Sequence, residues 1–377
     1  IMKNLLFVCS IISILFACVG GDEMPEKSKA ASVSVPNESY AESRIRLNKT
    51  LETSPNNFQA LLESAALALE HYDYAMAYAD AAKAFRIDSS SHRARMMYAL
   101  SIINQGNRTV ADISRAQSYL QIVVNKDPKN VKAMVGLANT YALQQDFDEA
   151  RLWIDKALEE APKFFDAHVL QGSMYKVLSA ALSGEDGSQA LSQAYMDSAI
   201  NTYSRVSQYY PDRPEIYIEL GILFQQTNNE RCVDHFYSAV QLEPENIDYK
   251  YALAYAYGLF GQERLAMQVY EEMQELDSLY SEAYCQMGQI YQKKYGELDS
   301  ALNMYREVVA IDPSHIDAYV NMGVIYAEQK AYTRALKSYS KALSILPEDR
   351  GPFMPLSTFI ENQNLAREYA DEIKDKL

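Results

Sequence analysis

Histidine and cysteine are the residues of this chain with the greatest capacity for metal binding and nucleophilic chemistry. The five histidines are spread widely and form neither a His-Glu-x-x-His motif nor a Cys/His spacing typical of a metal site: His71, His92, His168, His235 and His315. Glycine-rich phosphate loops and a serine nucleophile elbow are also missing from the sequence. We therefore expect no catalytic residues, no metal ion and no cofactor, and we interpret the chain as a non-enzymatic protein.

The segments that carry these residues follow a repeating pattern of prolines. Successive prolines of the pattern are 73, 34, 49, 33, 69 and 34 residues apart: Pro55, Pro128, Pro162, Pro211, Pro244, Pro313 and Pro347. These spacings fit one period near 34 with omitted prolines and insertions, which is typical of a helical repeat array. Each proline marks the end of a helix, because proline lacks a backbone N–H and restricts the residue before it.

The last two periods show the pattern most clearly. Large, small and aromatic residues recur at fixed offsets: Tyr319, Met322, Gly323, Tyr326, Ala335, Tyr339, Ala342 and Pro347 in the last, and Tyr284, Met287, Gly288, Tyr291, Ala301, Tyr305, Val308 and Pro313 in the one before. These residues resemble the tetratricopeptide repeat, in which each repeat consists of a helix A and a helix B. In that pattern the small residue, here Gly323 or Gly288, lets helix A approach helix B closely.

The resemblance implies an all-α fold, a right-handed superhelical α-solenoid of about eight tetratricopeptide helix pairs with capping helices. The eight repeats span residues 58–91, 92–130, 131–164, 165–213, 214–246, 247–280, 281–315 and 316–349. Insertions are expected around Asn104–Ile113 and as one residue near Gly296. A longer insertion near Val177–Ala194 includes residues 183–187, a polar stretch with two glycines that predicts a loop.

Both ends of the array are expected to carry capping elements, because an end repeat has no neighbour to cover its apolar face. Residues 41–57 predict an N-terminal capping helix. Residues 350–377 predict C-terminal capping helices, and two of them are expected, Leu356–Gln363 and Leu365–Lys374.

The first residues resemble a bacterial lipoprotein signal. Lys3 precedes an apolar run of about a dozen residues, and Ala17 stands directly before Cys18, as in a lipobox. The resemblance implies a signal peptide at 1–17, acylation of Cys18 with palmitate-type chains, and a flexible tether at 18–40. We expect a lipid-anchored protein of a Gram-negative cell envelope, in the outer membrane, with its periplasmic or surface face left open. An ordinary signal peptide with a chance cysteine is the alternative.

Charge and cysteine content narrow the possible partners. The chain has a formal net charge of −15, which argues against nucleic acid and favours neutral or basic partners. Cys232 and Cys285 lie a whole repeat apart, too far for a disulfide, so buried free thiols are expected. The oligomeric state is left open by the sequence.

In tetratricopeptide arrays the concave wall is formed by helix A residues that packing does not use. The resemblance assigns these residues to a partner-binding groove: Asn139, Ile218, Ile222, Tyr251, Tyr255, Gln286, Gln289 and Asn321. Tyrosines beside amides suit an extended peptide, because the amides can satisfy its backbone groups while the rings cover its side chains. The alternative is that Tyr251 and Tyr255 pack against a neighbouring helix.

Acidic residues stand near the starts of three predicted A helices, at Asp248, Glu282 and Asp317. They are either partners of the helix dipole or an acidic rim for a basic ligand.

Two functions are compatible with these features. The first is a scaffold or adaptor that binds protein partners in a secretion, outer-membrane assembly or cell-wall complex. The second is a lipoprotein that captures a peptide or glycan for an outer-membrane uptake system. Glycan sites usually stack sugars on exposed aromatic rings, and the single tryptophan, Trp153, is a weak sign of such a site.

Overall fold

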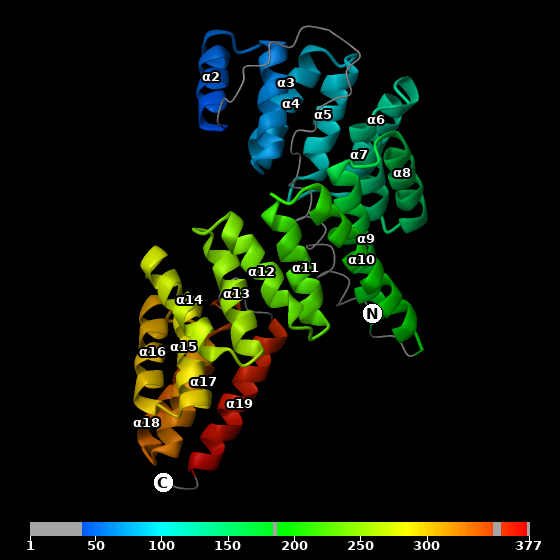
Figure 1. Ribbon diagram of the computed structural model, residues 1–377. Coiled ribbons are helices and arrows are strands. Elements are labelled where there is room, and N and C mark those ends of the chain that lie inside the picture. The colour runs from blue at the N-terminus through cyan, green and yellow to red at the C-terminus, as the bar shows by residue number, and fades with distance from the viewer. Residues whose placement is uncertain (1–39, 184–186, 350–355, 375–377) are drawn as a thin grey trace. The chain divides into compact units, whose positions relative to one another are not determined.

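The computed structural model describes residues 40–183, 187–349 and 356–374, which form helices and turns with no β-strand (Figure 1). The prediction of an all-α solenoid of about eight helix pairs is confirmed. The predicted signal peptide, Cys18 and the tether up to residue 39 lie outside the described residues. Within the described part of the chain, no helix is both long enough and apolar enough to cross a bilayer.

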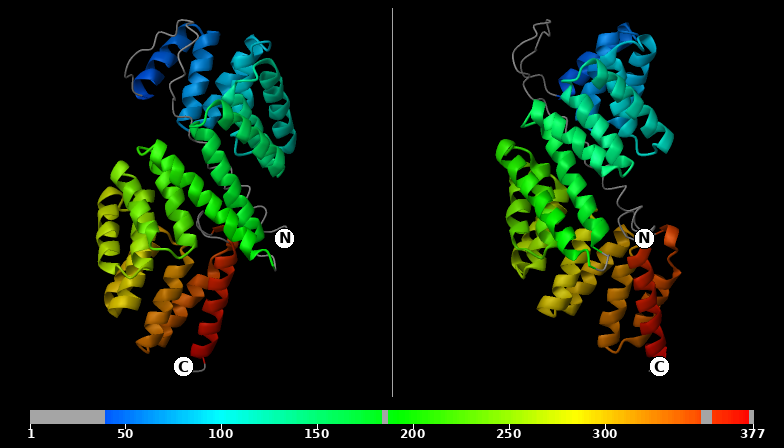
Figure 2. Two further views of the ribbon diagram at one scale, coloured as in Figure 1. Left: turned by 45° about the vertical axis from the view of Figure 1, so that its right-hand side comes forward. Right: turned by 90° about the vertical axis from the view of Figure 1, so that its right-hand side faces the viewer.

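The helices fall into two compact units, an N-terminal unit up to Pro211 and a C-terminal unit from Asp212 onward. The helices of the N-terminal unit are α2 (Tyr40–Thr53), α3 (Phe58–Glu70), α4 (Tyr74–Ile87), α5 (His92–Ile103), α6 (Val110–Lys126), α7 (Val131–Leu143), α8 (Phe147–Glu160), α9 (Phe165–Leu182) and α10 (Gln189–Tyr209). After the predicted capping helix α2, they succeed one another as pairs, which Figure 2 shows from two further sides.

The C-terminal unit continues the same succession of pairs. Its helices are α11 (Pro214–Gln226), α12 (Arg231–Leu242), α13 (Ile247–Leu259), α14 (Glu263–Leu276), α15 (Ser281–Ile290), the π-helical turn η1 (Tyr291–Tyr295), α16 (Leu298–Ile311), α17 (Ile316–Glu328), α18 (Tyr332–Ser344), the 3₁₀ turn η2 (Pro347–Asp349) and α19 (Leu356–Lys374). Two helices lie within each of the eight predicted repeats, while the exact repeat boundaries stay predictions.

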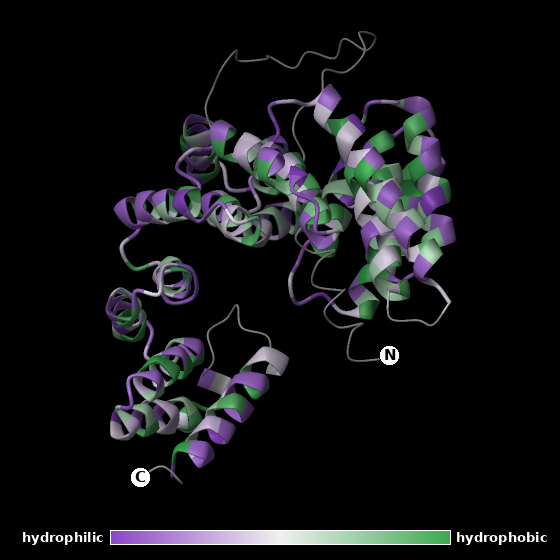
Figure 3. Cartoon of the chain, turned by 60° about the horizontal axis from the view of Figure 1, so that its bottom comes forward, coloured by the Kyte–Doolittle hydropathy of each residue, from purple (hydrophilic) through white to green (hydrophobic). Residues whose placement is uncertain are grey.

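Local sequence signals explain where these helices begin and how they pair. Asn57 and Asp73 cap α3 and α4, since their side chains accept hydrogen bonds from backbone N–H groups in the first turn. Hydrophobic and hydrophilic residues are interspersed along the helices (Figure 3); the B helices such as α18 are amphipathic, whereas A helices such as α7 and α9 are buried on nearly all sides. The apolar faces form the core, in which alanines, leucines and tyrosines are fully buried.

The small residue of helix A has the steric role that the repeat pattern predicts. A Cβ atom placed on Gly323 would lie 2.3 Å from the Tyr339 ring of the paired helix. The corresponding distance is 2.4 Å between Gly221 and the Phe236 ring. Because carbon atoms in contact prefer separations of about 3.5–4.0 Å, only glycine leaves room for the aromatic ring at these positions.

The turn between helix A and helix B is also repeated. In six of the eight pairs a residue of the short turn has a left-handed backbone: Tyr72 (φ 64°), Gln145 (65°), Asn228 (52°), Gly261 (75°), Gly296 (69°) and Lys330 (58°). Gly187 (φ 85°) has one in the longer connection between α9 and α10. A left-handed residue ends helix A and reverses the chain, a role that glycine fulfils with the least strain.

More of the inserted residues are helical than the sequence predicts. The loop predicted at 183–187 falls between α9 and α10, with residues 184–186 outside the described part, and most of the insertion near Val177–Ala194 extends these two helices. Ser179 and Ser192 join the two extended helices through hydrogen bonds from each hydroxyl to the other residue's carbonyl, both 2.8 Å long. The single residue inserted near Gly296 is absorbed by the π-helical turn η1, whose wider winding takes one extra residue.

The C-terminal cap is one helix, so the prediction of two helices is wrong. Helix α19 runs without a break from Leu356 to Lys374 and packs against α17 and α18. Its residue Phe359 is fully buried. A helix of this kind covers the apolar face that the last pair would otherwise expose.

The single tryptophan of the chain belongs to the N-terminal unit. Trp153 on α8 is half-buried and packs at the edge of the core cluster shared by α5 to α9. The Lys156 ammonium lies 4.0 Å from the centre of its ring.

Candidate functional site

Four tyrosines meet on the helix A side of the C-terminal unit. The Tyr251 ring on α13 lies 6.3 Å from the Tyr255 ring, 6.2 Å from the Tyr270 ring and 5.9 Å from the Tyr280 ring, measured between centroids. Tyr270 is fully buried and Tyr251 is half-buried, whereas Tyr255 keeps 39% of its surface exposed. Tyr251 therefore belongs to the packing between helices, and Tyr255 extends this aromatic cluster to the surface.

The Glu282 carboxylate, in the first turn of α15, organises the polar groups beside these rings. Its Oε1 accepts hydrogen bonds from the Tyr251 hydroxyl at 3.3 Å and from Gln286 Nε2 at 3.1 Å. Its Oε2 lies 3.3 Å from His315 Nε2. Cys285, one helical turn after Glu282, has its sulfur within 4.8 Å of ligand atoms on both Glu282 and His315.

Burial and these contacts shift the pKa values of the cluster. Burial alone would raise the pKa of Glu282, but the hydrogen bonds from His315, Gln286 and Tyr251 outweigh it and lower the pKa. Burial alone would lower the pKa of His315, but the contacts with Cys285 and Glu282 raise it. Burial also raises the pKa of the Cys285 thiol.

The two open interpretations of the helix-start acids can now be compared. Glu282 is bound within the cluster just described, and Asp317 in the first turn of α17 accepts a hydrogen bond from Asn362 of α19. Asp248 is exposed. Two of the three acids thus take part in internal contacts, which does not fit a continuous acidic rim.

A charged pair lies close to the tyrosines. Lys250 on α13 is buried and donates a 2.5 Å hydrogen bond from Nζ to Glu272 Oε2 on α14. This hydrogen bond is the largest cause that lowers the pKa of Glu272. The pair neutralises a buried ammonium where α13 packs against α14.

The structure brings only part of the predicted groove together. Tyr251 contacts both Tyr255 and Gln286, and Gln289 Nε2 lies 3.8 Å from the Cys285 sulfur. Ile218 and Ile222 on α11 and Asn321 on α17 are half-buried on neighbouring A helices. Asn139 belongs to the N-terminal unit and is only 2% exposed, so its side chain does not lie on a surface that a partner can reach.

Spacing along the sequence failed to predict the cluster around Cys285. Cys285 and His315 are 30 residues apart and form no short motif, yet their potential ligand atoms lie within 4.8 Å of one another; the expectation of no metal ion stays a prediction. The repeat itself contained the signal. His315 directly precedes α17, as Tyr280 directly precedes α15 one repeat earlier, and successive A helices of a solenoid are neighbours.

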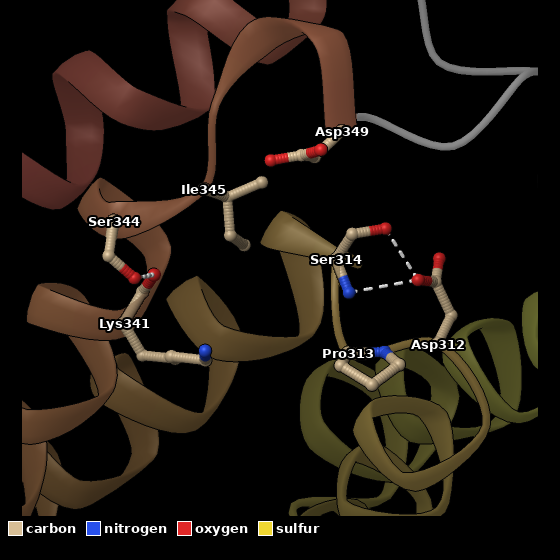
Figure 4. Close-up of a pocket in the computed structure, with 7 residues that line it drawn as sticks. All are labelled: Asp312, Pro313, Ser314, Lys341, Ser344, Ile345 and Asp349. Atoms are coloured by element: carbon tan, nitrogen blue, oxygen red, sulfur yellow. Dashed lines mark hydrogen bonds between the residues drawn. The ribbon is translucent and has the colours of Figure 1, made fainter.

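A shallow pocket lies elsewhere in this unit, at the turn before α17 (Figure 4). It is lined by Asp312, Pro313, Ser314, Lys341, Ser344, Ile345 and Asp349. Asp312 Oδ1 accepts hydrogen bonds from the Ser314 backbone N–H at 2.9 Å and from its hydroxyl at 2.6 Å. These bonds stabilise the turn, which is the ordinary use of an aspartate at such a position.

Comparisons with known families agree with the architecture. Residues 110–173 and 316–349 match models described as tetratricopeptide repeat, and residues 294–330 match one described as TPR repeat. No curated protein matches the chain. The chain therefore contains tetratricopeptide repeats, in both of its units.

The chain is also similar to solved structures. Human IFIT1 in complex with m7Gppp-AAAA has 16% identity and a TM-score of 0.52, and the match covers 89% of this chain and 78% of that one. A tetratricopeptide repeat protein from Parabacteroides merdae has 16% identity and a TM-score of 0.47, with 73% and 98% covered. At these identities the likeness shows the fold alone. Tetratricopeptide repeats imply a protein-interaction scaffold, and the repeat fold is generally non-enzymatic.

Proposed function

We propose that this chain is a lipid-anchored adaptor of a Gram-negative cell envelope that binds a protein partner through the C-terminal unit. The binding surface is made by Tyr255, the rim of Tyr251 and the amide of Gln286, and it is called the tyrosine–amide surface below. The observation that carries the proposal is Tyr255, a large ring that is 39% exposed although the neighbouring rings are used for packing.

The chemistry of this surface suits a peptide segment. Tyrosine gives a large contact area at a low cost in conformational entropy, and it is enriched where partners bind tightly. Gln286 Nε2 donates both to the Tyr251 hydroxyl at 3.4 Å and to Glu282 at 3.1 Å, so its orientation is fixed before a partner arrives. A surface that is already ordered loses less entropy on binding.

Charge indicates which partner segments are favoured. The chain is strongly acidic, with a formal net charge of −15, and Asp248 is exposed at the start of the helix that carries Tyr255. A neutral or basic segment with apolar side chains would meet no long-range repulsion here. The complex remains open among secretion, outer-membrane assembly and cell-wall machinery.

The envelope location is supported by the sequence around Cys18, where an apolar run and Ala17 resemble a lipobox. Two or more acyl chains on one cysteine give stable membrane attachment, whereas a single chain gives only marginal attachment. Cys18→Ser is expected to abolish incorporation of a palmitate analogue and to move the protein from the membrane fraction to the soluble fraction. If Cys18→Ser stayed in the membrane fraction and the wild type incorporated no palmitate analogue, the lipid anchor would be excluded.

Photo-crosslinking in living cells tests the binding surface. A photoreactive phenylalanine is placed at Tyr255, and the matched control is Tyr295, an exposed tyrosine of the same unit at the π-helical turn. A discrete protein adduct at position 255, with none at 295, is the expected result, and mass spectrometry then identifies the partner.

A second measurement separates binding from proximity. With the identified partner, Tyr255→Ala is expected to weaken binding by about 10-fold or more, as for an exposed aromatic anchor, and Tyr295→Ala to leave it unchanged. Equal crosslinking at both positions, or no adduct at 255 in correctly located protein, would reject this surface as the binding site.

A further inference from the structure

Three potential metal ligands of different chemistry meet inside the C-terminal unit. A carboxylate oxygen of Glu282, the sulfur of Cys285 and a ring nitrogen of His315 all lie within 4.8 Å of one another. Carboxylate, thiolate and imidazole are the ligands that zinc binds in proteins, and zinc readily accepts a mixed set of them.

The backbone fixes these ligands on two consecutive A helices. Glu282 and Cys285 are three residues apart on α15, so their side chains project from the same face of the helix. His315 is the residue directly before α17, where the chain turns into the next helix. The contact between the two helices therefore brings the ligands together, and packing of Cys285 in the same core cluster as Ile316 holds that contact in place.

Two of the three ligands are buried, and the third is partly exposed. Cys285 is 1% exposed and His315 is 7% exposed, whereas the Glu282 side chain keeps 41% of its surface. An ion can thus reach the cluster past Glu282 while the soft ligands remain shielded from water. Three protein ligands with one open direction are the arrangement in which zinc keeps a water as its fourth ligand.

Neighbouring side chains already orient the ligands. The Tyr251 hydroxyl and Gln286 both donate to Glu282 Oε1, which leaves Oε2 directed toward His315 Nε2 at 3.3 Å. The Nδ1 atom of His315 is buried without a hydrogen-bond partner. Outer contacts that fix a ligand carboxylate are typical of metal sites, and their loss commonly weakens binding by about 10–100-fold.

We infer that Glu282, Cys285 and His315 form a zinc-binding site that ties α15 to α17. The second buried cysteine of the C-terminal unit, Cys232, supports this assignment by contrast. It is fully buried, but within the described residues it belongs to no group of three potential ligands. The site borders the tyrosine–amide surface, because Tyr251 and Gln286 both donate hydrogen bonds to Glu282, but metal titration of the chain alone tests it without a partner.

Cobalt and zinc titrations test the site. The full chain is purified in mild detergent, stripped with a chelator and titrated with Co²⁺, which gives a near-ultraviolet charge-transfer band only when a thiolate binds it. One equivalent of Co²⁺ is expected to produce the band, and Zn²⁺ is expected to displace it. Cys285→Ser is expected to lose the band, while the matched control Cys232→Ser keeps it.

A third variant covers the case in which Cys285→Ser fails to fold. Glu282→Gln alters a partly exposed side chain and leaves the thiol in place. It is expected to retain the cobalt band but to bind Zn²⁺ at least about 10-fold more weakly by calorimetry, with an unchanged circular dichroism spectrum. No band in the wild type, a band that persists in Cys285→Ser, or unchanged zinc affinity in Glu282→Gln would overturn the assignment.

Discussion

Replacing Gly323 by alanine tests the steric logic of the repeat. The added methyl carbon would lie 2.3 Å from Cε1, 2.6 Å from Cδ1 and 2.7 Å from Cζ of the Tyr339 ring. The shortest of these distances is about 1.2 Å less than the 3.5 Å at which carbon atoms begin to repel (3.5 minus 2.3). Tyr339 is 1% exposed, so its ring cannot move into solvent to relieve the overlap.

The size of the effect follows from two opposing terms. Overpacking of a buried site costs about 1–3 kcal/mol. Replacing glycine by alanine inside a helix contributes about 1 kcal/mol in the other direction through helix propensity. The net loss in the free energy of unfolding is then about 0–2 kcal/mol, which is hard to interpret alone because the two terms partly cancel.

A matched control removes the propensity term. Gly258 in α13 has no atom within 4 Å of an added Cβ, so Gly258→Ala gains propensity without any clash. The two variants should differ by about 1–3 kcal/mol, with Gly258→Ala the more stable. For a domain of this size that is a difference of about 2–12 °C in melting temperature by far-ultraviolet circular dichroism. Equal melting temperatures, or a more stable Gly323→Ala, would refute the reasoning.

Four further changes have defined outcomes. Glu272→Gln should lower the free energy of unfolding by about 0.5–1 kcal/mol at pH 7, a small value because the carboxylate is 43% exposed. The Lys250 hydrogen bond lowers the pKa of Glu272 below its usual 4.5, so this stability is present above pH 4.5 and is lost as the pH falls through the folded pKa. The urea unfolding curves of the wild type and the variant should therefore converge in acid. Burial raises the pKa of Cys232 to about 11, so peptide mapping should find it unmodified by iodoacetamide at neutral pH and modified after unfolding; labelling of the folded protein would contradict its burial. Lys330→Gly should stabilise by about 0.5–1 kcal/mol in urea unfolding because φ is 58° there, and a loss would show that the turn does not strain lysine. Phe359→Ala should cost about 3–5 kcal/mol as a buried ring of the cap is lost, and an unchanged melting temperature would mean that α19 does not stabilise the last pair.

The regular part of the fold could be predicted from the sequence because the repeat fixes it sterically. A glycine facing an aromatic residue of the next helix, as in Gly323 and Tyr339, has one close-packed arrangement, and the same offsets recur through the chain. The start of a helix can also be predicted where an Asn or Asp residue caps it, as Asn57 caps α3.

The irregular parts could not be predicted because composition conflicts with the structure. The segment near Val177–Ala194 is rich in serine and alanine, and serine also forms hydrogen bonds between helices, as Ser179 and Ser192 do. The C-terminal cap carries Gln363 and Asn364 in its middle, which suggested a break. No proline or glycine stands there, however, so nothing ends the helix.

The candidate site could be predicted only in part. Tyr251 and Tyr255 were recognised from their spacing of four residues on one helix. Whether each ring is buried or faces solvent depends on the neighbouring helices. The Tyr251 ring packs against Tyr270 and Tyr280, which partly bury it. The approach of His315 to Cys285 depends on the contact between successive A helices, which no local pattern records.

The position of Trp153 allows the unfolding of the N-terminal unit to be followed by a separate optical signal. The only indole is in the N-terminal unit, where it packs on the core of α5 to α9. Its fluorescence therefore reports the melting of that unit alone, whereas circular dichroism reports the helices of both. Coincident curves from the two signals would mean that the units unfold in one cooperative step, and separated curves would assign a stability to each half of one unmodified molecule.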